Sequence, residues 1–139
     1  APLGPVYQAG TLSGNPVAVS AGLAQLERLD AKVYETLEAL GARLERGLVE
    51  ATARRGVEAC VQRVGSMLTP FFTEGPVRSW TDAARADTAR FGAWHGALLA
   101  RGVMWPPAQF EAAFVSLAHD EEALSATEAA IDAAFAAIA

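Results

Sequence analysis

A glycine-rich turn offers the first candidates for ligand binding: Gly10, Thr11 and Ser13. Gly10 and Gly14 let the backbone approach a ligand closely, while Thr11 and Ser13 provide hydroxyl donors. The turn precedes an apolar-patterned stretch, and the N-terminus of a helix there would add N–H groups and the positive end of a dipole. Such a turn suits a phosphate group. An ordinary capped junction between a loop and a helix would have the same residues, because glycine-rich turns are weak motifs.

Glu111 is the candidate for contact with a substrate. It lies between Phe110 and Ala112, in a loop that Pro106 and Pro107 stiffen. A carboxylate among apolar neighbours can approach an amino group of a substrate or intermediate. A solvated loop glutamate would show the same pattern, so the residues by themselves leave both interpretations open.

The other reactive side chains favour structural roles. Cys60 is the only cysteine, which excludes an internal disulfide and a cysteine-based zinc site, and we predict that it is a buried small hydrophobe. His95 and His119 have no third ligand at metal spacing. We predict half-buried packing for His95, a strand-end position for His119, and no metal site.

Two helices are predicted in the first part of the chain. Apolar residues recur at helical spacing over residues 16–29 and again, as a leucine stripe, over 31–54. Asn15 suits the N-cap of the first helix, with Pro16 at its first position. Gly56 suits the end of the second.

The pattern then changes to β-rich runs. Residues 57–73 predict two strands joined by a turn, with Pro70 at an edge or bulge because it cannot donate to a ladder. Ser79 and Asp82 have the form of a capping box, which predicts a helix from there to about Arg101.

The last third alternates extended and helical patterns. Gly102 ends the preceding helix, residues 103–105 form a short extended run, and residues 113–118 predict a further strand. Asp120 caps a final helix. This order of elements predicts an α+β fold whose antiparallel sheet packs against helices.

Composition excludes several classes of function. The 139 residues carry a net charge of −5 and no basic stripe mixed with aromatics, so we expect no nucleic-acid partner. Apolar runs fall short of the roughly 20 residues that span a bilayer, so we expect no membrane segment. We therefore expect a soluble, cytoplasmic protein, and its start at Ala1 fits a fragment or a processed chain.

Four strings along the chain resemble the glutamate-1-semialdehyde 2,1-aminomutases, pyridoxal-phosphate enzymes of the class III aminotransferase group. They are GPVYQAGTLSGNPVAVSAGLAQLE, GSMLTPFFTEGPV, DTARFGAWHGALLARGV and PPAQFEAAFVSLAHDEE. They occur in the family's order and together span nearly the whole chain. GTLSGNP combined with QFEA is specific for the family, and either string alone is only suggestive.

The resemblance implies a C-terminal portion of a fold-type-I enzyme. Residues 1–30 would close the cofactor-binding large domain and form a linking helix, and residues 31–139 would form the small α+β domain. It implies pyridoxal or pyridoxamine phosphate as cofactor, a small-molecule substrate and a homodimer. Gly10, Thr11 and Ser13 would contact the phosphate of the partner subunit's cofactor, and Glu111 would face the active site.

The same resemblance places the Schiff-base lysine upstream of GTLSGNP. Lys32 is the only lysine of this chain, so we expect the chain by itself to be inactive. The intact enzyme would convert glutamate-1-semialdehyde to 5-aminolevulinate for tetrapyrrole synthesis. Residues 102–139 contain no arginine or lysine, which favours the aminomutase over a transaminase. Another class III transaminase or racemase, and a non-catalytic binding module, remain the alternatives.

The loop around QFEA departs from the family pattern. Trp105 and Pro106 stand where the family suggests Leu-Ala, Ala108 where it suggests Ser, and Ala113 where it suggests Gly. These differences concern the shape of the Glu111 loop.

Overall fold

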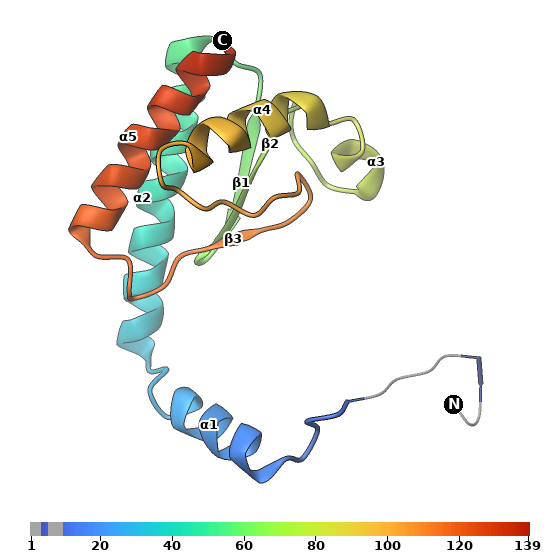
Figure 1. Ribbon diagram of the computed structural model, residues 1–139, viewed down its shortest axis with the longest axis vertical. Coiled ribbons are helices and arrows are strands. Elements are labelled where there is room, and N and C mark those ends of the chain that lie inside the picture. The colour runs from blue at the N-terminus through green and yellow to red at the C-terminus, as the bar shows by residue number, and fades with distance from the viewer. Residues whose placement is uncertain (1–3, 6–9) are drawn as a thin grey trace. The chain divides into compact units, whose positions relative to one another are not determined.

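The computed structural model describes residues 4–5 and 10–139, and the chain divides into two compact units, Ala1–Val33 and Tyr34–Ala139. Residues 6–9 of the first family string lie outside the described residues. Figure 1 shows helix α1 in the first unit and the sheet with helices α3 to α5 in the second, while α2 runs from one unit into the other. Over the described residues, no helix is long and apolar enough to cross a bilayer.

Helix α1 (Pro16–Leu26) begins as its sequence predicts. Asn15 is the N-cap in an extended conformation, and Pro16 occupies the first helical position. The helix contributes no buried side chain, and Val17 is 78% exposed.

Helix α2 (Ala31–Arg55) presents its predicted leucine stripe to the core of the second unit. Leu44 and Leu48 are buried on this face. Gly56 ends the helix at φ +62°, a conformation that costs glycine little. Gly41 of the same helix lies so close to the turn after the first strand that a Cβ there would collide with the carbonyl oxygen of Gly65.

The sheet has three antiparallel strands in the order β1 (Cys60–Val64), β2 (Met67–Phe71), β3 (Ala113–Phe114). The α+β prediction is therefore confirmed. Pro70 pairs with Val61 of β1 on the central strand, but β3 reaches only Met67 and Leu68. At Pro70 the sheet thus has an edge, and proline fits because no third strand needs its missing N–H.

Strand β3 is much shorter than the predicted residues 113–118. Val115 N still donates to Ser66 O at 2.9 Å, and then the chain turns. In this turn Ser116 N donates to His119 Nδ1 at 3.0 Å. The polar side chains of SLAH therefore close a local turn that competes with strand pairing.

The predicted helix from Ser79 to Arg101 is wrong, because the structure has two helices there, α3 (Trp80–Ala83) and α4 (Thr88–Leu99). Asp87 makes the break. Its N–H donates to Phe72 O at 2.9 Å, and its carboxylate accepts from Arg90 N as a new N-cap. A hydrogen bond to the end of β2 therefore interrupts the helix at Asp87.

The core of the second unit is aromatic. Helices α4 and α5 (Glu121–Ile138) pack together over the sheet and enclose Trp94 and Phe135, both fully buried. Phe72 lies 5.7 Å from Trp94 and 5.9 Å from Phe135 between ring centroids. Full burial of such a side chain contributes roughly 1.5–3 kcal/mol to folding.

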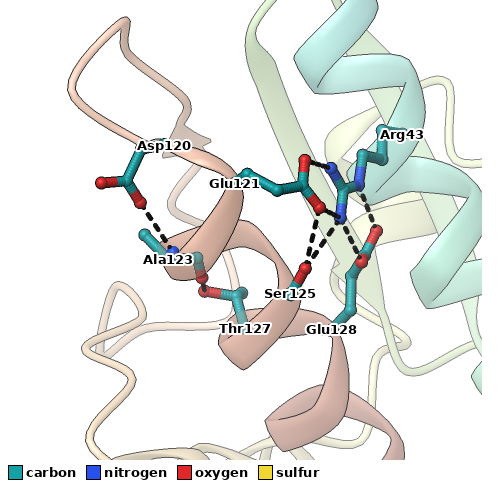
Figure 2. Close-up of polar contacts among 7 residues, drawn as sticks. All are labelled: Arg43, Asp120, Glu121, Ala123, Ser125, Thr127 and Glu128. Atoms are coloured by element: carbon teal, nitrogen blue, oxygen red, sulfur yellow. Dashed lines mark hydrogen bonds and ion pairs between the residues drawn. The ribbon is translucent and has the colours of Figure 1, made fainter.

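An arginine ties helix α5 to α2 (Figure 2). Arg43 donates to Glu121 at 2.6 Å and to Glu128 at 2.8 Å, and it also reaches Ser125. The hydrogen bond to this guanidinium holds the pKa of Glu121 below its ordinary value. Further along the two helices, Arg54 and Arg55 share Asp132.

Candidate functional site

The turn over residues 10–14 is closed by its own backbone. Ser13 N donates to Gly10 O at 3.0 Å and Asn15 N donates to Leu12 O at 3.0 Å. Gly14 adopts φ +76°, and a Cβ on Gly10 would collide with the hydroxyl of Ser13. The positive φ therefore favours glycine at Gly14, whereas at Gly10 the missing Cβ leaves the space that the Ser13 hydroxyl occupies.

The N-terminus of α1 has no free N–H group to offer a phosphate. Asn15 Oδ1 accepts from Val17 N at 3.0 Å and from Ala18 N at 3.2 Å, and Val19 N donates to Asn15 O at 2.9 Å. Pro16 has no N–H. The expectation that helix amides contribute to phosphate binding is corrected here, because Asn15 satisfies them.

Thr11 is the strongest donor left in the turn. Gly10, Thr11 and Ser13 are all exposed, and the Ser13 amide is already used within the turn. The Thr11 hydroxyl makes no hydrogen bond to any residue that the structure describes. A single exposed residue thus offers both a hydroxyl and its own main-chain amide as donors, which together match a phosphate oxygen.

Glu111 lies in the second unit, at the end of a loop held against β2. Its main chain is bonded at both ends: Glu111 N donates to Ala108 O at 3.1 Å, and Thr69 Oγ1 donates to Glu111 O at 3.1 Å. The side chain is exposed, and its carboxylate has no hydrogen-bond or ion-pair partner among residues 4–5 and 10–139. The backbone of Glu111 is therefore fixed while its carboxylate stays available.

Gln109 and Thr69 fix this loop, and neither is singled out by the sequence patterns. Both are buried, at 2% and 8% exposure. The sequence signal was present in one case, because Gln109 follows two prolines and precedes Phe110 within QFEA. A polar residue that must be buried in such company needs main-chain partners.

The remaining candidates have structural roles. His95 is half-buried and stacks on Phe91, as predicted, and its Nε2 lies 2.9 Å from Trp105 O. The predicted strand-end position of His119 is wrong: β3 ends at Phe114, and His119 lies in the turn before α5. Cys60 is half-buried at the start of β1, so its predicted burial is corrected: among the described residues, β1 is an edge strand of the sheet.

The last candidates are Lys32 and the possible metal ligands. Lys32 is exposed in the first turn of α2. The described part of the chain holds no group of three histidine, cysteine or acidic side chains that could bind a metal ion.

Known proteins resemble the chain in sequence and in structure. Glutamate-1-semialdehyde 2,1-aminomutase of Sorangium cellulosum is 65% identical over 136 residues, which is 98% of this chain and 31% of that enzyme. A solved glutamate-1-semialdehyde aminomutase from Pseudomonas aeruginosa PAO1, in complex with PMP, superposes with a TM-score of 0.82 at 22% identity, covering 98% of this chain and 31% of that one. No protein-family model matches.

An omega-transaminase from Sphaerobacter thermophilus has the same fold, with a TM-score of 0.77 and 26% identity over 96% of this chain and 30% of that one. The chain thus spans about a third of the length of the relatives it matches. The chain is a homologue of the C-terminal portion of the glutamate-1-semialdehyde 2,1-aminomutases, within the class III aminotransferase group.

Proposed function

We propose that this chain forms the C-terminal part of an aminomutase that converts glutamate-1-semialdehyde to 5-aminolevulinate, the reaction that feeds tetrapyrrole synthesis. The observation that carries the proposal is the 65% identity to an aminomutase over nearly the whole chain. Such identity is well above the 26% shared with an omega-transaminase of the same fold. Residues 1–30 then belong to the cofactor-binding domain and its linking helix, and residues 31–139 to the small domain.

The proposed cofactor is pyridoxal or pyridoxamine phosphate, and the turn over residues 10–14 fits its phosphate. Thr11 would donate its hydroxyl and amide, Gly10 would contribute main chain that can approach the phosphate closely, and Ser13 is the second hydroxyl. When bound, the cofactor supplies the group that carries the substrate's amino group. In the proposed homodimer this turn serves the partner subunit's cofactor.

Glu111 is the proposed substrate-facing residue. Its carboxylate is exposed and unpaired among the described residues, so it can accept a hydrogen bond from the substrate's amino group without first breaking another. Its negative charge would also favour the protonated form of that amine. The small domain thereby contributes one wall of the substrate pocket.

The chain by itself is proposed to be inactive. Lys32 is its only lysine and begins a helix rather than following the phosphate-type turn. A Schiff base needs a lysine beside the cofactor. That residue would come from sequence upstream of the GTLSGNP string.

A transaminase is the second candidate, since an omega-transaminase shares the fold. It would accept an external amino donor, whereas the aminomutase would not. A non-catalytic binding module is the third, and would bind no cofactor in any form.

An absorbance titration with pyridoxal phosphate tests the proposal. The chain should show no Schiff-base band, and the chain extended upstream through the expected lysine should show one. Thr11→Ala should weaken cofactor binding by about tenfold, the worth of one charge-assisted bond. Ser20→Ala, which removes an exposed hydroxyl from α1, is the matched control. If the extended chain shows no band, the enzymatic proposal is overturned.

A further inference from the structure

Gln109 makes a two-point contact with the main chain of β2. Its Oε1 accepts from Phe72 N at 3.2 Å, and its Nε2 donates to Pro70 O at 2.8 Å. The side chain is 2% exposed, so neither bond competes with water.

These two bonds take the place of a missing strand. Strand β3 pairs with β2 only at Met67 and Leu68. An antiparallel neighbour next to Pro70 and Phe72 would supply one donor and one acceptor. The carboxamide of glutamine supplies both from a single side chain. Gln109 therefore continues the hydrogen bonding along β2 on the side where β3 begins.

Apolar packing does not hold the loop with comparable specificity. Pro106, Pro107 and Ala112 line a largely apolar cavity of about 360 Å³. On the loop's exposed side Phe110 meets Trp80 edge to face at 5.0 Å, and both rings are partly open to solvent, at 45% and 67% exposure. The directional contacts between the loop and β2 are those of Gln109 and Thr69.

We infer that Gln109 is a positioning residue, whose carboxamide fixes the place from which the Glu111 carboxylate meets the substrate. The inference rests on the proposed function, in which Glu111 faces the substrate. Displacement of a reacting group by about 1 Å can cost about 100-fold in rate. Loss of the Gln109 contact should therefore act on the reaction rather than only on folding.

Two variants separate the effect of the Gln109 hydrogen bonds from the effect of its side-chain volume. Gln109→Met keeps the length and apolar packing but removes both hydrogen bonds. Gln109→Glu keeps the acceptor for Phe72 N, and its carboxyl can donate to Pro70 O only when protonated. Burial raises the pKa of such a carboxyl, so the contact should return as the pH falls.

Amide hydrogen exchange in this 139-residue chain tests the contact itself. Gln109→Met should lower the protection factors of Phe72 N and Glu111 N at least tenfold. In Gln109→Glu the protection should recover toward acid pH after correction for intrinsic exchange. Ile131→Val, which removes one carbon from the buried face of α5, is the stability control. It should leave the ratio of protection factors between these two amides and the core amides unchanged. Unaltered protection in Gln109→Met would overturn the contact.

Kinetics of the complete enzyme test the positioning. Gln109→Met should lower kcat ten- to 100-fold with less than a threefold change in KM, and Ile131→Val should not lower it. Glu111→Gln should also lower kcat, and the double variant should lose less than the product of the two single losses. Independent, multiplicative losses would overturn the positioning role while leaving the aminomutase assignment intact.

The same experiment distinguishes failure of the proposed function. If Glu111→Gln leaves kcat unchanged, the substrate-facing role of Glu111 falls, and the positioning inference falls with it. If the complete wild-type enzyme has no aminomutase activity, the proposed function itself fails. The exchange result then still decides whether Gln109 fixes the loop.

Discussion

The two candidate segments of this chain are held in opposite ways. The turn over residues 10–14 is closed by bonds between residues three apart, such as Ser13 N to Gly10 O. The Glu111 loop has one such local bond, Glu111 N to Ala108 O, but it is tied to the sheet by bonds between residues 37 to 42 apart, through Gln109 and Thr69. The first segment has its shape from local sequence, whereas the second depends on the finished sheet.

This difference predicts how each segment responds to damage. Loss of tertiary structure in the second unit should abolish the Glu111 geometry and leave the Gly10 turn and α1 formed to their own local extent. Loss of the α1 cap should do the reverse. The following changes test that separation, beginning with the largest expected effect.

Gly41→Ala should weaken the scaffold beneath the Glu111 loop most. The new Cβ would collide with the main-chain oxygen of Gly65, which cannot move without shifting the β1–β2 turn. Such overpacking costs about 3 kcal/mol of the free energy of unfolding. Denaturant unfolding followed by tryptophan fluorescence measures it, since Trp94 and Trp105 are buried in this unit.

Gly47→Ala is the matched control on the same helix. There the nearest atom to a new Cβ is Glu128 Cγ at 3.5 Å, an ordinary contact. Alanine should stabilise by about 0.5–1 kcal/mol through its higher helix propensity. Equal stability of the two variants would refute the close approach at Gly41.

Thr69→Val should loosen the Glu111 loop without disrupting the sheet. It leaves the Glu111 carbonyl oxygen without its partner, which costs about 1–2 kcal/mol. Amide exchange should rise around residues 108–112. Thr52→Val, which removes a buried hydroxyl bonded within α2 to Val49 O, should leave that loop protected.

Asn15→Ala should act on the first unit alone. The variant frees Val17 N and Ala18 N at the start of α1, at a cost of about 1 kcal/mol in helix stability. Far-UV circular dichroism and exchange of the α1 amides should report fraying. A lower midpoint for the second unit would contradict the separation of the two segments.

The smallest effect concerns pH and the α2–α5 contact. Hydrogen bonding to Arg43 lowers the pKa of Glu121, and bonding to Arg55 and Arg54 lowers that of Asp132. Their stabilisation is therefore full above the ordinary carboxyl pKa values of about 4 and is lost as the pH falls through the lowered ones. Glu121→Gln should flatten the fall of Tm between about pH 5 and pH 2, whereas Glu122→Gln should not.

Helix caps and helix ends were predictable from the sequence, whereas the short length of β3 and the break at Asp87 were not. The Asn15 cap, the Gly56 and Gly102 helix ends and the Asp120 cap depend on neighbouring residues, and all are present. The break at Asp87 was missed because its cause, the bond to Phe72 O, joins a helix to a strand end.

The residues of the candidate site also differ in how much the sequence alone could show of them. The turn with Gly10, Thr11 and Ser13 could be recognised from its glycines, and its role remains a prediction. The sequence could not show that Asn15 already accepts hydrogen bonds from the amides at the start of α1. The fixing of Glu111 by Gln109 was missed because the QFEA string, although it hints at burial, does not show which main-chain atoms the glutamine bonds.

The substitution of a side chain for a strand has an evolutionary consequence. Extending β3 by two residues toward Pro70 would turn Glu111 and Ala112 into strand residues and so rebuild the Glu111 loop itself. The Gln109 contact, in contrast, can be gained, lost or retuned by a single codon change. Among proteins that share this sheet, the conformation of the loop can therefore diverge quickly while the fold stays constant. Substrate preference can then change through few substitutions.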